Sequence, residues 1–519
     1  MILGGREKVK RNLLKALGIS FLIFAVLSWV IPVGTYTSGK LTTSNIAPIG
    51  LVDLINKPIS AVVTFALYGV VFAVIGGFYG VVNKTGVLEK ISEKMANSFK
   101  GKENKFLIIT VILFTVLSSV TGLVIPLFVL VPLFAAILFK MNYDKVTALA
   151  ATVGGLLVGN VASTYGFNIT GYTKNLLSLD MNNQIVARLI LLCLLTVLLA
   201  VTVISVANRK SAKKEVKKAA KEEPKKVSKV EPKKAVKKAA TKKKTTAKKG
   251  TKKSNTRALA VTKPVKKVSD RSKLSAAPFV VILVIMLILA MVAMYNWYYS
   301  FNVKVFNDAY EAVMGVKIQG FKIFENLFSG LSQLGYWSNL EFTGLLIITS
   351  MIIAKVYKLS LNEYVESFIA GVKKWLPTAI YATLASVILV VLYQALQAGS
   401  GTLVDTINGK IFGLVDGFNP ITTGVSTLVS SFFYNDLYYL LATMSSFVSG
   451  YDAAAISNAG LIIQSVYGVA MLIFPTSAIL IAGLSIFDVS YKKWVKYIWK
   501  FALIAFLSIL LISGIVTLL

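Results

Sequence analysis

The sequence predicts an all-α polytopic membrane protein, made of two repeated halves with re-entrant or broken helices and about 10 to 12 membrane segments. Three observations predict this fold class. Hydrophobic residues make up 55% of the 519 residues, and the mean hydropathy is +0.70. Charged residues make up only 15% and stand between long apolar runs. Two of these runs, one on each side of a Lys-rich stretch, contain a polar interruption.

The first half begins with a basic segment and an apolar run that predicts a membrane span over about residues 17–33. No small-residue cleavage site follows this run, so we expect a retained span and not a signal peptide. Because Lys and Arg concentrate on the cytoplasmic side, the N-terminus is predicted to be cytoplasmic. A second span is expected over about residues 59–82, where three glycines allow close helix packing.

The rest of the first half combines short and interrupted helices. Residues 106–140 are too many for one span and barely enough for two, and Thr121, Gly122 and Pro126 divide them, which predicts short, tilted or re-entrant helices there. Residues 147–171 are apolar but rich in Gly, Ser, Thr and Asn, so we expect a break within 160–168. An apolar run at about 185–206 predicts a closing span.

Residues 209–273 are Lys-rich and of low complexity. They contain 27 Lys and Arg against 5 Asp and Glu, and so carry 22 of the 33 net positive charges of the chain. With almost no apolar residue larger than valine, the segment cannot bury a core and is predicted to be a disordered cytoplasmic linker. We therefore divide the chain into an N-terminal transmembrane half (1–208), this linker, and a C-terminal transmembrane half (274–519).

The second half repeats the scheme of ordinary spans, a hydroxyl-rich segment, a broken helix and a closing span. An amphipathic segment at 301–335 is expected to lie at the membrane interface. The expected membrane segments cover about residues 278–299, 340–356, 376–396, 421–448, 464–494 and 497–518.

The most informative stretch is 464–494, because Pro475, Thr476 and Ser477 interrupt it. Proline removes a backbone donor and clashes with the preceding turn, so the helix is predicted to open at Pro475. In hydrocarbon an opened backbone is tolerated only where protein or a watery cavity satisfies it. Broken helices in corresponding positions of two halves are typical of secondary transporter sites. A simple proline kink is the alternative.

The two predicted breaks define a candidate site for a small solute. Helix N-termini at a break can bind a carboxylate, hydroxyl and amide groups can hydrogen-bond it, and freed carbonyls can coordinate Na⁺. These small polar residues could instead only hold helices together. The candidate substrate- or ion-binding residues are Asn160, Ser163, Thr164, Asn168, Ser445, Ser446, Gln464, Thr476 and Ser477.

Three carboxylates stand near predicted membrane ends. A buried carboxylate in a membrane protein is a functional candidate, but loop positions are expected for Asp405 and Asp452. If one of the three, such as Asp436, faces the site, a cationic amino acid becomes a plausible substrate.

Several kinds of chemistry have no support in the sequence. There is no histidine to relay protons or bind a metal, and the single Cys193 excludes a disulfide or a thiolate cluster within the chain. No phosphate-binding loop or catalytic triad is present. The sequence therefore predicts a non-enzyme without a cofactor, and leaves coupling to Na⁺ or H⁺ open.

Five motifs carry a resemblance to a known family. They are IPVGTY at 31–36, GGFYGVVNKTGVLEKI at 76–91, NYDKVTALAATVGGLLVGNVAST at 142–164, the interrupted stretch at 464–494 with its Tyr-x-x-Trp ending and, more weakly, GTLVDTI at 401–407. With these motifs the chain resembles the anaerobic C4-dicarboxylate carrier family and its uncharacterised relatives, within the ion transporter superfamily. The resemblance implies alternating access, with a mobile site-bearing domain moving against a fixed, dimerising scaffold, and hence a homodimer.

Three departures from the family pattern concern the site. A glutamate-containing segment is replaced by TGLVIP at 121–126, and Asn-Pro-Phe by YGFN at 165–168. The polar second hairpin is represented only by Ser445 and Ser446. These departures leave the substrate and the coupling ion open.

The leading hypothesis is a secondary active transporter in the cell membrane for small organic anions or amino-acid-like solutes, ion-coupled or working by exchange. A basic amino-acid antiporter or peptide-fragment carrier of the same fold is the alternative transporter. An alternative of another class is a membrane anchor whose polybasic loop tethers nucleic acid. For residues 209–273 we expect contact with anionic lipids first, with nucleic acid or protein docking as lesser alternatives.

Overall fold

The computed structural model describes residues 2–37, 39–166, 171–222, 275–397 and 401–518. Within these ranges the chain is almost entirely helical, and two short β-hairpins are the only sheets. In this described part of the chain, eight helical segments are long and apolar enough to cross a membrane, and four shorter apolar helices accompany them. The predicted fold class, an all-α polytopic membrane protein, is confirmed.

The first half contains three long helices and a set of short ones. The long ones are α1 (Ile2–Ser28), α2 (Asp53–Thr85) and α10 (Ile185–Glu222), and the hairpin of β1 (Gly34–Thr37) and β2 (Lys40–Thr43) follows α1. The others are α3 (Val87–Ser98), α4 (Glu103–Thr121), α5 (Val124–Phe128), α6 (Leu130–Lys140), α7 (Lys145–Leu149), the π-helical turn η1 (Ala150–Gly154), α8 (Gly155–Val161) and α9 (Tyr172–Leu177).

The second half begins with two helices joined by a long excursion. The helices are α11 (Ala277–Met294) and α15 (Asn339–Val356), and the excursion contains α12 (Trp297–Phe301), α13 (Val305–Met314), β3 (Lys317–Ile318), β4 (Phe321–Lys322) and α14 (Ile323–Leu327). The remaining helices are α16 (Leu361–Leu384), α17 (Val387–Gln397), α18 (Leu403–Phe412), α19 (Pro420–Phe433), α20 (Leu437–Val448), α21 (Ala453–Ile473), α22 (Ala478–Phe487) and α23 (Tyr491–Leu518).

The two halves share one order of elements. Each has a helical hairpin (α4 to α6, then α19 and α20), a broken helix (α7 to α9, then α21 and α22) and a long closing helix (α10, then α23). Both predicted breaks are present, because α8 ends at Val161 and α21 ends at Ile473, two residues before Pro475. Flanking Gly and Asn in one half and proline in the other explain why the helices stop there.

Four boundaries differ from the sequence prediction. The first span ends at Ser28, because residues 34–43 pair as the β1–β2 hairpin. The segment 421–448, predicted as one piece, is divided by a non-helical turn between α19 and α20. The span expected from residue 376 begins at residue 361, where Ser360 and Glu363 form a capping box. Helix α10 continues to residue 222, into the linker predicted to be disordered, since its Lys, Ala and Glu residues favour helix. The rest of that linker, 223–273, lies outside the described residues.

The loop position expected for Asp405 is wrong. Asp405 lies in the first turn of α18, where Thr402 and Asp405 form a capping box, and its side chain is only 9% exposed. Asp452 is exposed and caps the start of α21, where its Oδ1 accepts a hydrogen bond from the backbone N–H of Ala455 at 2.8 Å. Neither carboxylate belongs to the cavity described below.

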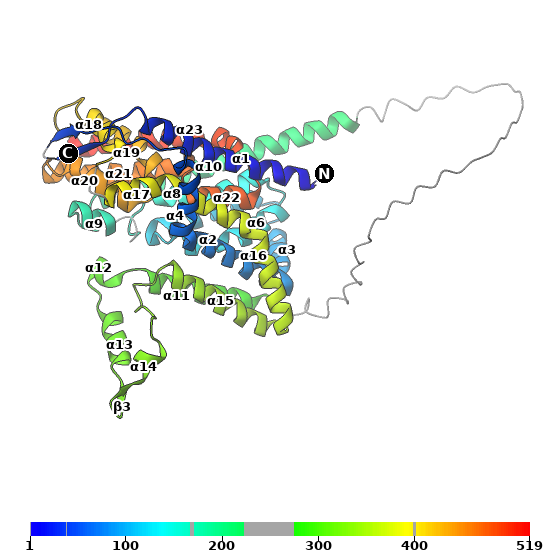
Figure 1. The fold of residues 1–519 in the computed structure, drawn as a ribbon. Coiled ribbons are helices and arrows are strands. Elements are labelled where there is room, and N and C mark those ends of the chain that lie inside the picture. Colours follow the sequence, from blue (N-terminus) through cyan, green and yellow to red (C-terminus); the bar gives the residue numbers. More distant parts are fainter. Residues whose placement is uncertain (1, 38, 167–170, 223–274, 398–400, 519) are drawn as a thin grey trace, which may run out of the picture.

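Helix α2 of the first half and α16 of the second half pack closely and run antiparallel. A methyl group built on Gly371 would lie 2.1 Å from the backbone oxygen of Gly76, so backbone meets backbone without an intervening side chain. Small residues permit this kind of contact between membrane helices. Helices α11 and α15 lie together along one edge of the body, next to α2 and α16 (Figure 1).

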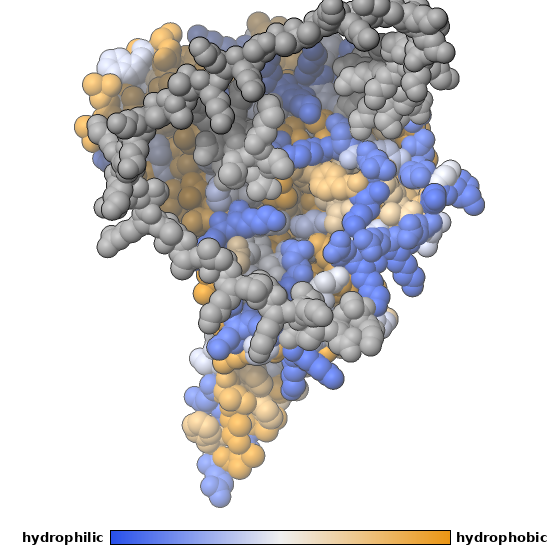
Figure 2. Space-filling model, turned by 90° about the vertical axis from the view of Figure 1, so that its right-hand side faces the viewer, coloured by the Kyte–Doolittle hydropathy of each residue, from blue (hydrophilic) through white to orange (hydrophobic). Residues whose placement is uncertain are grey.

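The excursion between α11 and α15 projects from the body (Figure 1). Its surface exposes apolar side chains, including Val305, Ile318, Phe321 and Leu327. Figure 2 shows this projection as a largely hydrophobic cone, whereas hydrophilic side chains gather on much of the face above it. Helix α3 lies on the side of the molecule seen in that view.

Candidate functional site

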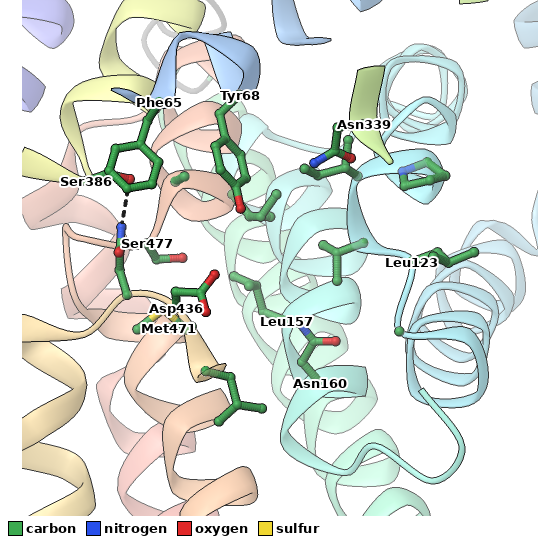
Figure 3. Close-up of a pocket in the computed structure, with 18 of the residues that line it drawn as sticks. Phe65, Tyr68, Leu123, Leu157, Asn160, Asn339, Ser386, Asp436, Met471 and Ser477 are labelled. Atoms are coloured by element: carbon green, nitrogen blue, oxygen red, sulfur yellow. Dashed lines mark hydrogen bonds between the residues drawn. The ribbon is translucent and has the colours of Figure 1, made fainter. Parts of the chain in front are cut away.

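The helix breaks of both halves meet at one cavity of about 330 Å³. Its lining comes from the α4–α5 turn, the last turn of α8, the α19–α20 turn and the α21–α22 turn, and from α2 and the α16–α17 junction. Figure 3 shows Asn160, Asp436 and Ser477 around this space, with Tyr68 of α2 closing it from another side. A cavity lined by irregular backbone within apolar helices is the arrangement expected of a transport site.

Asn160 brings the first break to the cavity. It lies in the last turn of α8, and its side-chain oxygen accepts a hydrogen bond from Ser118 Oγ of α4 at 3.2 Å. Ser163 and Thr164 do not line the cavity. Both are buried, and Ser163 Oγ and the backbone N–H of Thr164 donate to the backbone oxygen of Ser119 at 3.3 and 3.1 Å. Ser163 and Thr164 therefore fasten the break to α4.

Ser477 brings the second break to the cavity. It caps α22, accepting a hydrogen bond from the N–H of Leu480 at 3.4 Å, and it lines the space together with Ala478. The free N–H groups and positive dipole end of α22 can thus act on a solute. Thr476 is buried, and its hydroxyl has no hydrogen-bond partner within the described ranges.

Gln464 joins the two broken helices. Its Nε2 donates to the backbone oxygen of Ser163 at 3.0 Å, and its side chain is fully buried outside the cavity lining. One turn further on, Gly468 lies against the backbone of Val161, where a methyl group would approach the Cα atom to 2.5 Å. Gln464 is therefore placed to couple the two breaks and not to contact a solute directly.

The structure does not bring Ser445 and Ser446 to the cavity. They lie near the end of α20 that is far from its break, and their hydroxyls donate to Ala442 and Thr443 of the same helix. Such bonds back to the preceding turn satisfy hydroxyls in apolar helices. Asn168, the remaining candidate, lies outside the described residues.

Asn435 is a central residue that the sequence analysis did not select. Its Nδ2 donates to the backbone oxygen of Thr476 at 3.0 Å, to Ser386 Oγ at 3.1 Å and to the oxygen of Ala385 at 3.3 Å. It thereby ties the α19–α20, α21–α22 and α16–α17 junctions together. The hydroxyl of Tyr467 in turn donates to the backbone oxygen of Asn435 at 2.9 Å.

Asp436 is the only charged residue among the described residues that line the cavity. It caps α20, where its Oδ1 accepts a hydrogen bond from the N–H of Tyr438 at 2.9 Å. No basic side chain in the described ranges forms an ion pair with it. An Asn-Asp pair in an apolar run is a helix N-cap signal, which could have identified this turn from the sequence. The side chains of Asp436 and Tyr68 both point into the space (Figure 3).

The cavity also depends on a kink in α2. Phe65, which lines it, leaves helical geometry with φ −108° and ψ 18°. This kink lies across the cavity from the breaks and next to Ser386 (Figure 3). No cluster of three or more His, Cys, Asp or Glu residues suited to a metal occurs in the described parts of the chain.

Among solved structures, the chain is similar to the Alcanivorax borkumensis YdaH transporter, described as having an unusual topology, with 13% sequence identity, a TM-score of 0.32 and 98% of each chain covered. No curated protein sequence matches the chain.

The sequence profile of the C4-dicarboxylate anaerobic carrier family (DcuC) matches residues 16–519, which is essentially the whole chain. The resemblance inferred from the motifs is confirmed, and a transporter family together with eight apolar helices indicates a multi-pass membrane protein. The chain belongs to the C4-dicarboxylate anaerobic carrier family.

Proposed function

We propose that the protein is a secondary active transporter that carries an amino-acid-like solute, with an ammonium and a carboxylate group, through the cavity at the helix breaks. The observation that carries this proposal is Asp436, a carboxylate that faces the cavity without a basic partner among the described residues. An ammonium group would neutralise it, while the N-terminus of α22 at Ser477 suits a carboxylate.

Electrostatics favours this solute over a dianion. Two unit charges about 4 Å apart interact by about 4 kcal/mol at an effective dielectric constant of 20. The interaction with Asp436 is attractive for an ammonium group and repulsive for a dicarboxylate, so the same residue separates the two solute classes. A basic amino acid, with its second cationic group, fits the same argument.

A C4-dicarboxylate is the second candidate, and the family supports it. For this solute Asp436 would have to be protonated during binding, which makes the uptake of dicarboxylate depend on protons. The amide and hydroxyl groups of Asn160 and Ser477 would then face its carboxylates.

Alternating access fits the arrangement of the halves. Helices α2 and α16, which pack backbone to backbone, suit a rigid scaffold, whereas the hairpins and broken helices suit a mobile body that carries the site. The N-terminus and residues 209–273 are assigned to the cytoplasm, because they hold the densest basic charge. A membrane anchor, in contrast, would have no use for a polar cavity between apolar helices.

Uptake into proteoliposomes tests the proposal. Labelled neutral and basic amino acids, short peptides and C4-dicarboxylates are compared, with imposed Na⁺ and proton gradients. In Asp436→Asn the side chain can still cap α20, so the substitution removes the charge and keeps the helix start. We expect at least a tenfold loss of uptake of the ammonium-bearing solute, which corresponds to about 1.4 kcal/mol or more.

Asp452→Asn is the matched control, because Asp452 caps α21 in the same way but is exposed and outside the cavity. It should transport like the wild type. Unchanged kinetics of Asp436→Asn, or transport by the wild type of dicarboxylates alone at a rate independent of pH, would contradict the proposed solute class.

A further inference from the structure

Arg188 is a fully buried cation without a carboxylate partner. It lies in the first turn of α10 and is 0% exposed. Its Nη1 donates to the backbone oxygens of Thr164 at 3.4 Å and Met181 at 3.3 Å, whereas Nε and Nη2 have no partner among the described residues. Residues 167–170, which follow the break in sequence, contain no acidic residue. An unpaired buried charge costs several kcal/mol, so its presence requires a reason.

The second half gives the comparison. Arg188 is the fourth residue of the closing helix α10, and Trp494 is the fourth residue of the closing helix α23. Trp494 is fully buried, and its Nε1 donates to the backbone oxygen of Leu472 at 2.8 Å, just before the second break. Both side chains thus donate to a carbonyl beside the break of their own half. The Trp494 side chain is neutral, whereas the Arg188 side chain is positively charged.

The comparison with Trp494 distinguishes what the charge of Arg188 contributes from what its hydrogen bonds contribute. Tryptophan has a single donor and uses it, so a neutral side chain is enough to satisfy a carbonyl at a break. Arginine leaves two of its donor nitrogens without partners in the described structure. Hydrogen bonding therefore does not account for arginine at position 188, and what arginine adds is a positive charge that cannot be lost.

Arg188 lies at the first break and not at the cavity. Arg188 does not line the cavity, whereas it contacts the oxygen of Thr164, beyond the end of α8. The C-terminal end of a helix has a negative partial charge, and freed carbonyls of this kind coordinate Na⁺ in transporters built from broken helices. The guanidinium donates to one carbonyl at the break, that of Thr164, and to the backbone oxygen of Met181 in the loop before α10.

We propose that Arg188 is a built-in cation that takes the place of a bound sodium ion at the first break, so that the first half binds no Na⁺. Any ion coupling then falls to the second half, where Asp436 supplies a carboxylate. This last consequence rests on the proposed function, but the role of Arg188 does not, and it can be tested with Na⁺ alone.

The experiment measures thermal unfolding of the purified full-length protein in chloride salts of Na⁺, K⁺ and choline, followed by tryptophan fluorescence. Arg188→Ser removes the charge and leaves space for an ion, and Arg188→Lys keeps the charge. We expect Arg188→Ser to unfold at a lower temperature in choline, with at least about half of this loss recovered in Na⁺ and less in K⁺. Arg188→Lys should gain no more from Na⁺ than the wild type does.

Trp494→Phe is the matched control in the second half, because it removes a neutral hydrogen-bond donor. This variant should lose the same stability in all three salts. Equal effects of Na⁺ on the wild type and on Arg188→Ser would overturn the proposal. The proposal would also be overturned if formate stabilised the wild type but not Arg188→Ser. That result would mean that Nε and Nη2 of Arg188 bind an anion. If Arg188→Ser does not fold, Arg188→Gln replaces it, and a melting profile of Arg188→Gln like that of Arg188→Lys would refute a role for the charge.

Discussion

Replacing Asn435 by alanine tests whether the helix junctions must be held together for transport. The side chain donates to Thr476 and Ala385 backbone oxygens and to the hydroxyl of Ser386. The side-chain amide has only two N–H hydrogens, so it can form at most two good hydrogen bonds to these three acceptors, and the alanine variant loses those two. The backbone oxygen of Thr476 loses a donor, which costs about 1 to 3 kcal/mol, and the Ser386 hydroxyl can rotate to another acceptor and loses less. We expect Asn435→Ala to destabilise the protein by about 2 to 4 kcal/mol.

The effect on transport should exceed the effect on stability. Asn435 connects three junctions that line the cavity, and a displacement of about 1 Å in a functional site can cost about a hundredfold in rate. Uptake per molecule of correctly folded protein is therefore expected to fall at least about tenfold. Thermal unfolding and proteoliposome uptake are measured on the same preparation, so that the two effects can be separated.

Asn458→Ala is the matched control for this prediction. Asn458 is buried, and its Nδ2 donates to the oxygen of Ser513 at 2.8 Å and to Thr517 Oγ1 at 2.7 Å, away from the cavity. It should lose similar stability but keep its uptake per folded molecule. The reasoning fails if Asn435→Ala retains normal uptake, or if both variants lose uptake to the same extent.

Three further predictions concern packing, capping and the linker. Gly371→Ala should destabilise the protein by at least about 1 to 3 kcal/mol, since its methyl group would strike backbone, whereas Gly344→Ala, inside α15 with open space for its methyl group, should keep or slightly raise the unfolding temperature. Ser477→Ala should lower uptake and cost about 1 kcal/mol as a lost helix cap, while Ser445→Ala should behave like the wild type, and equal uptake by both would contradict the site. Deletion of residues 209–273 should leave uptake largely intact, and a correctly inserted deletion protein without uptake would refute this.

The sequence was informative where the break signals are local. Proline at 475 and the crowding of Gly, Ser, Thr and Asn before 168 predicted both broken helices, and three of the candidate residues, Asn160, Thr476 and Ser477, lie at the breaks around the cavity or beside it. These signals act through backbone geometry within a few residues. They therefore need no knowledge of the neighbouring helices.

Other features have only a weak local signal or depend on contacts that no local pattern contains. The α19–α20 turn has neither Pro nor Gly and is marked only by the N-cap signal of Asn435 and Asp436, whereas the hydroxyl pattern favours Ser445 and Ser446, which lie at the other end of α20. In the sequence, Arg188 lies within an apolar run that predicts only a closing span. Its significance follows only from the meeting of α10 with the first break and from the equivalence with Trp494.

The interleaving of the halves has a consequence for how the protein can be assembled. Helices of the first half contact helices of the second half at several places, among them α2 with α15 and α16, α8 with α21, and α10 with α23. Neither half can bury its own apolar surface without the other. If the chain is divided within residues 223–274 and the two fragments are expressed separately, they should therefore associate in the bilayer and form one functional carrier.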